Sequence, residues 1–174
     1  MELTPNQMGA IAEAKVAAAA TQLDVTVLRP LFEDKRYDLV FDLGGRLVRV
    51  QCKSAPRKGG VIDLRARTSR RTATGYRRGT YSAADVDAVA GFCPQLDRCY
   101  LVPIDHFPPS GALSLRLLPA KNNQLKGLHF AAEYELNPGA IAQLEERVSG
   151  RHEVVGSSPT SSTLEEPCVA RLFS

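Results

Sequence analysis

Residues 37–53 have the sequence YDLVFDLGGRLVRVQCK, and this stretch decides the fold of the chain. Apolar and polar residues alternate on both sides of Gly44-Gly45, which is the pattern of two strands joined by a two-residue β-turn. If Leu43 pairs with Arg46, the register places Asp38 directly opposite Gln51. Side chains repeat on one face at every second residue, so Lys53 lies beside Gln51 on that face.

The two faces of this predicted hairpin differ in chemistry. One face carries apolar side chains suited to a core: Leu39, Phe41, Val48, Val50 and Cys52. The other face brings together the carboxylate of Asp38, the amide of Gln51 and the ammonium group of Lys53. Such a patch can hold a divalent metal ion and orient a water molecule.

The length and composition of the chain are those of one globular domain. It has 174 residues, of which 44% are hydrophobic and 24% are charged, and this length is sufficient to bury a core. No apolar run reaches the roughly 18–20 residues of a membrane span. The N-terminus also lacks the apolar core of a signal peptide, so we expect no membrane partner.

The cysteines favour a reducing compartment. Cys52, Cys93, Cys99 and Cys168 have no C-x-x-C spacing and no nearby group of histidines, so a zinc site is not expected. We interpret them as reduced thiols of a cytoplasmic protein. A Cys93–Cys99 disulfide is the alternative.

The net charge of +3 conceals a strongly basic segment. Between Arg46 and Arg78 there are eleven lysines and arginines and a single acidic residue, Asp63. A segment of this kind suggests a polyanionic partner, most simply nucleic acid. The alternative is a solvated basic loop.

Local patterns predict the order helix, strand, hairpin, basic loop, helix, strand. Capping signatures place helix starts at Thr4-Pro5-Asn6-Gln7 and at Ser82-Ala83-Ala84-Asp85. The predicted elements are a helix from residue 5, strands over 24–29, 61–65, 98–103 and 113–118, a loop over 68–80 and a short helix over 82–90. A hairpin within this order favours a mixed sheet covered by helices, and thus an α/β fold.

The C-terminal segment differs in character from the rest. Residues 139–147 (GAIAQLEER) and 154–163 (VVGSSPTSST) resemble the peptide obtained when a transfer-RNA gene is translated. The segment is rich in Ser, Thr, Gly and Glu, a composition typical of disorder. We therefore predict a domain over residues 1–137 and a poorly ordered tail over 138–174, with a helix over 140–148 as the alternative.

The spacing of Asp38, Gln51 and Lys53 resembles the signature of the PD-(D/E)XK nucleases. The likeness is strongest to homing endonucleases associated with group I introns, in which Gln replaces the second carboxylate. It runs from about Asn6 to Pro103, although Tyr37 stands where Pro gives the family its name. The resemblance implies a restriction-endonuclease-like core of the order α-β-β-β-α-β, a mixed sheet flanked by helices.

The resemblance also implies a role for each site residue. Asp38 would be the main ligand of Mg²⁺, with the side-chain oxygen of Gln51 and the backbone carbonyl of Cys52 as further ligands. Glu13, at the edge of the apolar stripe of the first helix, would complete the negative charge. Lys53 would orient the attacking water and stabilise the charge that develops on the phosphate.

The implied function is a metal-dependent DNA endonuclease of the homing or mobile-element type. Cutting both strands of double-stranded DNA needs two sites, so a homodimer or homotetramer is expected. Two alternatives stay open: a Holliday-junction-resolvase-like nuclease, and a DNA-binding protein with a degenerate nuclease site. The expected DNA-binding residues are Arg49, Arg57, Lys58, Arg65, Arg67, Arg70, Arg71, Arg77 and Arg78.

Other polar residues are predicted to be structural. Asp42 lies on the site face, but a strand rise of about 3.3 Å per residue places it far from Asp38. His106, His129 and His152 are isolated in the sequence and are expected to be hydrogen-bonded or solvated.

Overall fold

Three sheets and three α-helices form most of the computed structural model, which describes residues 3–32, 35–72, 75–118 and 127–153. The central sheet has the order β1-β2-β3-β8-β9. Its strands are β1 (Thr26–Leu28), β2 (Leu39–Asp42), β3 (Leu47–Ser54), β8 (Ala88–Cys93) and β9 (Arg98–Pro103). The β3–β8 pair is parallel and the other pairs are antiparallel, so the sheet is mixed, as predicted.

The other strands of the described residues form a second sheet and a separate two-stranded ribbon. The second sheet has the order β11-β10-β5-β4, formed by β4 (Arg57–Lys58), β5 (Val61–Arg65), β10 (Ala112–Arg116) and β11 (His129–Phe130). The ribbon pairs β6 (Arg67–Thr72) with β7 (Gly75–Thr80). The helices are α1 (Pro5–Gln22), α2 (Ala131–Tyr134), α3 (Pro138–Glu153) and the 3₁₀ turn η1 (Ile104–His106).

The central hairpin has the predicted register. The Leu43 N–H donates to the Arg46 carbonyl at 2.9 Å, and Leu39 pairs with Val50, which puts Asp38 opposite Gln51. Gly44 and Gly45 both have positive φ, of 65° and 92°, which a turn this tight requires and glycine adopts at little cost. The Asp42 carboxylate accepts the Gly45 N–H at 2.8 Å and so belongs to the turn.

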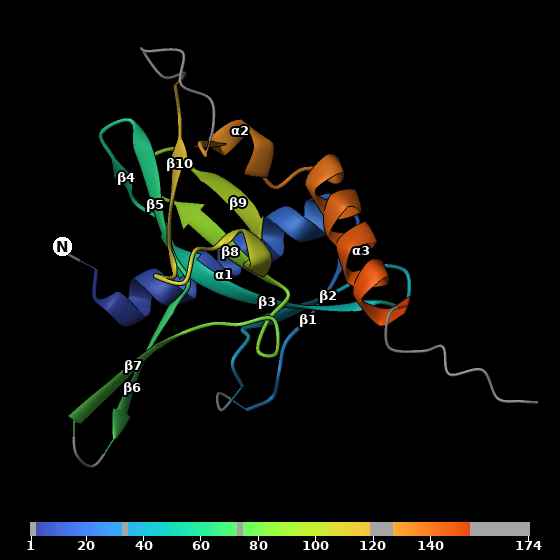
Figure 1. Ribbon diagram of the computed structural model, residues 1–174, viewed down its shortest axis with the longest axis horizontal. Coiled ribbons are helices and arrows are strands. Elements are labelled where there is room, and N and C mark those ends of the chain that lie inside the picture. Colours follow the sequence, from blue (N-terminus) through green and yellow to red (C-terminus); the bar gives the residue numbers. More distant parts are fainter. Residues whose placement is uncertain (1–2, 33–34, 73–74, 119–126, 154–174) are drawn as a thin grey trace, which may run out of the picture.

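Different layers cover the two faces of the central sheet (Figure 1). Helices α1 and α3 pack on one face, where Val16 and Leu144 join Phe41, Val48 and other strand residues in one buried cluster. The second sheet and α2 cover the other face. Within the described residues no helix is both long and apolar enough to cross a membrane.

The helix predicted over 82–90 is wrong. Ser82–Asp85 forms a single turn, in which the Asp85 carboxylate accepts the Ser82 N–H at 3.0 Å, and the chain then enters β8. All six residues of β8 are buried, because this strand lies inside the sheet with both faces covered. A strand buried in this way is apolar throughout and lacks the alternation that identifies a strand in sequence.

The loop predicted over 68–80 is also wrong, because these residues form most of the β6–β7 ribbon. Its register runs from the Arg67–Thr80 pair to the Thr72–Gly75 pair. Figure 1 shows the ribbon extending away from the two larger sheets. A ribbon that packs against no core needs no apolar face, so its sequence lacks the alternation by which strands are recognised.

The poor order predicted from residue 138 is wrong for residues 138–153, which form α3. Leu144 and Val148 are 1% and 4% exposed and pack into the cluster under α1. Together with Ile141 they repeat at helical spacing, so the segment has an apolar stripe despite its polar composition. Residues 154–174 lie outside the described residues, and the division of the chain at 137 stays a prediction.

Three cysteines are free thiols, so the alternative of a Cys93–Cys99 disulfide is wrong. In the β8–β9 register Cys99 is opposite Phe92, so Cys93 and Cys99 point to opposite faces of the sheet. Cys99 belongs to the cluster under α1 and Cys93 to the cluster under the second sheet. Cys168 lies outside the described residues.

Truncation of Leu144 tests whether α3 is part of the domain. We expect Leu144→Ala to lower the free energy of unfolding by about 2–5 kcal/mol, because it leaves a cavity in the core. The exposed neighbour Gln143 is the control, and Gln143→Ala should change the stability by less than about 0.5 kcal/mol. Urea denaturation measures both variants, and equal stability of the two would contradict the packing of α3.

Candidate active site

Asp38 is fixed where β2 begins. Its backbone N–H donates to the Val50 carbonyl at 3.0 Å, and its carboxylate oxygen Oδ2 accepts the backbone N–H of Cys52 at 2.8 Å. β2 begins at Leu39, so β2 offers no backbone carbonyl to the N–H of Cys52 on β3. The Asp38 carboxylate accepts this N–H instead. One backbone and one side-chain hydrogen bond therefore hold Asp38 against β3.

The Gln51 amide lies between two oxygen atoms of this site. Its Nε2 donates a short hydrogen bond to Asp38 Oδ2 and contacts the Cys52 carbonyl at 3.4 Å. Gln51 is only 5% exposed, so the amide is held in place by its surroundings. A carboxylate and a carbonyl oxygen thus converge on the Gln51 amide, and their role as metal ligands stays a prediction.

Glu13 on α1 lies on the same side of the sheet edge as Asp38. Both residues line a cleft of about 850 Å³ whose other residues come from the start of α1 and the 29–37 segment. The side chain of Glu13 is 28% exposed and forms an ion pair with Arg29. α1 therefore brings a second carboxylate to the cleft, and the predicted role of Glu13 at a metal ion stays a prediction.

Lys53 is mostly enclosed. Its Nζ lies 5.3 Å from the centre of the Tyr81 ring, a distance at which the ring attracts a cation. Burial lowers the pKa of Lys53, whereas the negative charges of Asp38 and Glu13 act in the opposite direction. Burial also raises the pKa of Tyr81 to about 12, so the phenol stays neutral beside the ammonium.

These donors fit a hard divalent cation. Rotating the Gln51 amide about its last side-chain bond exchanges Nε2 and Oε1, which presents an oxygen at the point where Asp38 Oδ2 and the Cys52 carbonyl converge. Carboxylate, carbonyl and amide oxygens are ligands that Mg²⁺ accepts. Within the described ranges no three His, Cys, Asp or Glu side chains form a metal-binding group.

Arg49 has several partners within the fold, and its predicted role in DNA binding stays a prediction. Its guanidinium donates to both carboxylate oxygens of Asp87 at 3.1 Å and to the carbonyls of Ala83 and Ala84 at 3.0 and 2.7 Å. The hydrogen bond with Asp87 raises the pKa of Arg49. Arg49 therefore fastens the turn before β8 to β3, and its donors are directed into the protein.

Four other predicted DNA-binding residues have internal partners. Lys58 and Arg65 both pair with Asp63, at 2.5 and 2.9 Å, and the hydrogen bond from Arg65 lowers the pKa of Asp63. Arg57 donates to the Gly59 carbonyl at 2.9 Å, and Arg67 to the Ser110 carbonyl at 2.8 Å. All four residues are exposed, so these contacts orient them at the surface.

The remaining predicted residues lie on the β6–β7 ribbon. The register pairs Arg70 with Arg77, and Arg71 and Arg78 occupy the adjacent positions opposite Tyr76 and Ser69. With Arg67 of β6, five arginines are thus concentrated on one short ribbon that extends from the body (Figure 1). The side chains of Arg70, Arg71, Arg77 and Arg78 lie outside the described part of the structure.

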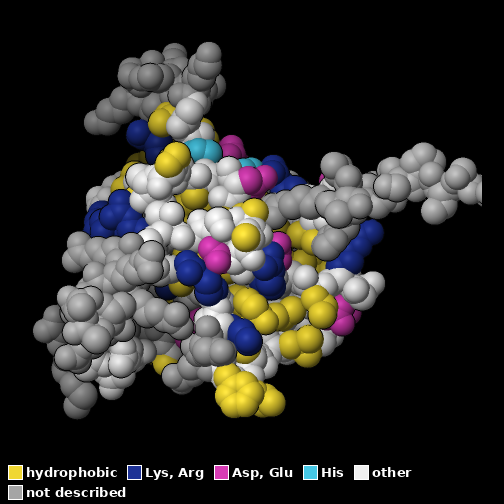
Figure 2. Space-filling view, turned by 60° about the horizontal axis from the view of Figure 1, so that its bottom comes forward, with side chains coloured by type: hydrophobic (Ala, Val, Ile, Leu, Met, Phe, Trp, Pro, Cys, Tyr) yellow, Lys and Arg dark blue, Asp and Glu magenta, His cyan; other side chains and the backbone are white. Residues whose placement is uncertain are grey.

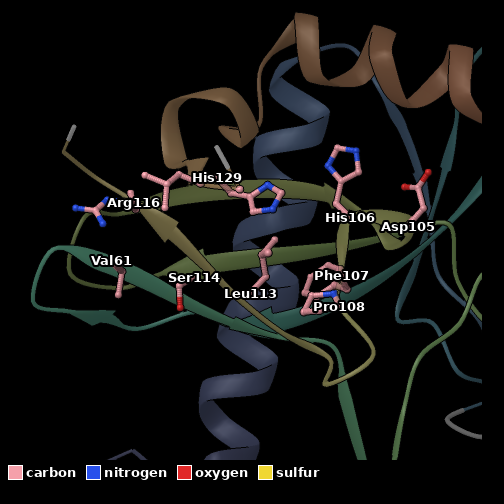
Figure 3. A pocket seen from close by; sticks show the side chains of 11 residues that line it. Val61, Asp105, His106, Phe107, Pro108, Leu113, Ser114, Arg116 and His129 are labelled. Carbon is pink, nitrogen blue, oxygen red and sulfur yellow. The ribbon is translucent and has the colours of Figure 1, made fainter. Parts of the chain in front are cut away.

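Two histidines that are isolated in the sequence meet in space. The Nδ1 atoms of His106 and His129 lie 2.9 and 2.7 Å from the hydroxyl of Tyr134. Both rings border a hollow of about 610 Å³. Figure 3 shows Arg116, His129, His106 and Asp105 along it, from left to right. His106 and His129 are hydrogen-bonded, as expected, and the side chain of His152 is not described.

No sequence pattern predicted the roles of two residues at the site. Arg29 and Tyr81 are distant in the chain from the residues that they contact, Glu13 and Lys53. Neither contact follows from strand or helix periodicity, because each joins different elements. Only the folded chain brings Arg29 to Glu13 and Tyr81 to Lys53.

Comparisons with known proteins identify the fold and the kind of site. The model of a family described as PD-(D/E)XK endonuclease matches residues 3–137. The fold is similar to that of the bacterial homing endonuclease I-Ssp6803I, with a TM-score of 0.65 and 26% sequence identity over 86% of this chain and 99% of the other. Among the curated proteins there is no significant match.

Replacing Arg49 separates a structural role from a DNA-binding role. We expect Arg49→Ala to lower the free energy of unfolding by about 1.5–3 kcal/mol, because the mostly buried carboxylate of Asp87 loses charged hydrogen bonds. Arg46→Ala, in the exposed turn, is the control. Reduced DNA affinity with unchanged stability in Arg49→Ala would show that Arg49 contacts DNA instead.

The pKa of His106 predicts a dependence of stability on pH. Burial, and then the positive charge of Arg147, lower the pKa of His106 in the folded chain. The unfolded chain therefore binds a proton more readily, so stability is lost as the pH falls from about 6.5 through the lower folded value. Thermal unfolding between about pH 7 and 5 should show a weaker loss in His106→Gln, and an identical loss would exclude this contribution.

Proposed function

The chain belongs to the PD-(D/E)XK endonuclease family and is a DNA endonuclease of the homing type, and we propose that it hydrolyses phosphodiester bonds with Mg²⁺ at the site of Asp38, Gln51 and Lys53. The observation that carries this proposal is the convergence of Asp38 Oδ2 and the Cys52 carbonyl on the Gln51 amide. Lys53 projects from the same strand, two residues beyond Gln51.

The proposed ligands of Mg²⁺ are Asp38, Gln51 and the backbone carbonyl of Cys52. Glu13 contributes its negative charge to the metal site, either as a direct ligand or through a water molecule. To do so, its carboxylate leaves the ion pair with Arg29 and turns to the metal ion. When bound, the metal supplies Lewis acidity and lowers the pKa of a coordinated water. Because Gln51 replaces a carboxylate, the site has one negative charge fewer, and we expect DNA phosphate to strengthen metal binding.

Lys53 is proposed to orient the attacking water and to stabilise the negative charge that forms on the phosphate. Its enclosure beside Asp38 supports this role, since charge interactions are stronger where water is excluded. The ring of Tyr81 also lies beside the ammonium, 5.3 Å from Nζ. Lys53 thus has a fixed position before substrate binds.

DNA is proposed to contact the β6–β7 ribbon and the exposed basic residues beside it. A two-stranded ribbon fits the major groove of duplex DNA, and arginine is the residue that most often binds guanine there. The internal contacts of Arg57, Lys58, Arg65 and Arg67 leave these residues at the surface, where they can also reach phosphates. Cutting both strands requires a second site, so we propose a homodimer or homotetramer.

A cytoplasmic location is also part of the proposal. It is supported by the free thiols of Cys52, Cys93 and Cys99, which are usual where thiols are kept reduced. Burial raises the pKa of Cys99 to about 11, so this thiol is unreactive at neutral pH.

Cleavage of plasmid DNA tests the proposed site. We expect Asp38→Asn and Lys53→Ala to lose cutting by at least about 100-fold while retaining DNA binding, because these residues act on the metal and the phosphate. Asp42→Asn is the matched control on the same hairpin and should cut normally. EDTA should abolish cutting, and Mg²⁺ should restore it.

Continued cutting by Asp38→Asn would exclude the proposed site. DNA binding without cutting by the wild type, over a range of metals and DNA sequences, would instead support the alternative of a degenerate nuclease site.

A further inference from the structure

Two large apolar side chains stand in solvent beside the site. Leu31 and Phe32 are 95% and 73% exposed, although both residues line the cleft that contains Asp38 and Glu13. Exposing two such side chains next to each other forgoes the stabilisation that burial of a Leu and a Phe provides. An apolar group kept exposed at the mouth of a site is typical of a contact surface.

Basic residues surround this apolar tip. Arg29 and Lys35 line the same cleft, and Arg36 follows next in the chain, where it pairs with Asp85 at 3.0 Å. Figure 2 shows a small group of hydrophobic side chains projecting at the lower edge of this face, below a group of Lys and Arg side chains. Although Arg29 pairs with Glu13 and Arg36 with Asp85, a partner with both an apolar surface and negative charge complements this tip best.

Duplex DNA satisfies both conditions better than a second copy of this chain. Its bases provide flat apolar faces, and its phosphates complement the basic residues. A second copy would bring the same basic residues to its own tip and repel them. The tip also presents only two side chains, far less than the roughly 800 Å² per partner of a stable protein interface.

We propose that Leu31 and Phe32 form an apolar wedge that contacts the bases of the bound duplex beside the phosphate at Asp38. The inference rests on the proposed function, since the wedge and the site share one cleft. Proteins that insert Phe or Leu between base steps unstack and kink the duplex. The wedge therefore favours steps that unstack easily, such as pyrimidine–purine steps, and contributes to the choice of cleavage position.

The chain contains no tryptophan, which provides a direct test. Phe32→Trp places a single fluorescent side chain at the wedge, and Leu47→Trp places one at an exposed position near the hairpin turn, where Leu47 is 58% exposed. Each variant is titrated with a short mixed-sequence duplex in Ca²⁺. The anisotropy of a dye on the duplex reports DNA binding in the same samples.

We expect the duplex to quench the fluorescence of Phe32→Trp and to protect it from acrylamide, with little change in Leu47→Trp. DNA binding with unchanged Phe32→Trp fluorescence overturns the wedge and leaves the proposed function intact. Absence of DNA binding in both variants and in the wild type overturns both proposals. A spectral shift that depends on protein concentration and not on DNA identifies a second copy as the partner and overturns the wedge.

A truncation of Phe32 tests the wedge without the added indole ring of tryptophan. Phe32→Ala should weaken duplex binding about tenfold, as loss of one base–aromatic stack does, and Leu47→Ala should leave it unchanged. Since Phe32 is exposed, the stability of Phe32→Ala should match that of the wild type. Equal DNA affinity of Phe32→Ala and Leu47→Ala also overturns the wedge.

Discussion

The register of the β2–β3 hairpin is the constraint on which the site depends. The tight turn at Gly44-Gly45 closes Leu43 on Arg46, and each pair outward from the turn is then fixed up to Asp38 and Gln51. A slip by one residue would turn every side chain of the strand to the other face and bury Asp38 in the core. The hydrogen bond from the Cys52 N–H to the Asp38 carboxylate closes the hairpin at its far end.

The position of β3 inside the sheet gives this hairpin its rigidity. β3 pairs with β2 on one edge and with β8 on the other, and the cluster under α1 covers one of its faces. Gln51 and Lys53 lie just beyond the last β2 pair, where β8 still pairs with the strand and the Asp38 carboxylate accepts the Cys52 N–H on the other edge. Enclosure has a cost, visible in the lowered pKa of Lys53, and the carboxylates of Asp38 and Glu13 offset part of it.

The basic segment divides into three groups with different physical roles. Arg49 fastens the turn before β8 through Asp87, so part of the charge stabilises the fold. Lys58 and Arg65 share Asp63, the single acid of the segment. The arginines of the β6–β7 ribbon stand apart from both groups. A count of charges along the sequence therefore overstates the surface that can meet DNA.

The sequence by itself determined the hairpin register, the placement of Asp38, Gln51 and Lys53 on one face, and the helix that carries Glu13. These features follow from local rules of turn geometry and side-chain periodicity, which act within a few residues. Only the tertiary structure decided that 88–93 is a strand, that Arg49 binds Asp87, that Arg29 reaches Glu13 and that Leu144 packs in the core. The physical reason is that each of these depends on contacts between distant segments, whose burial outweighs local preference.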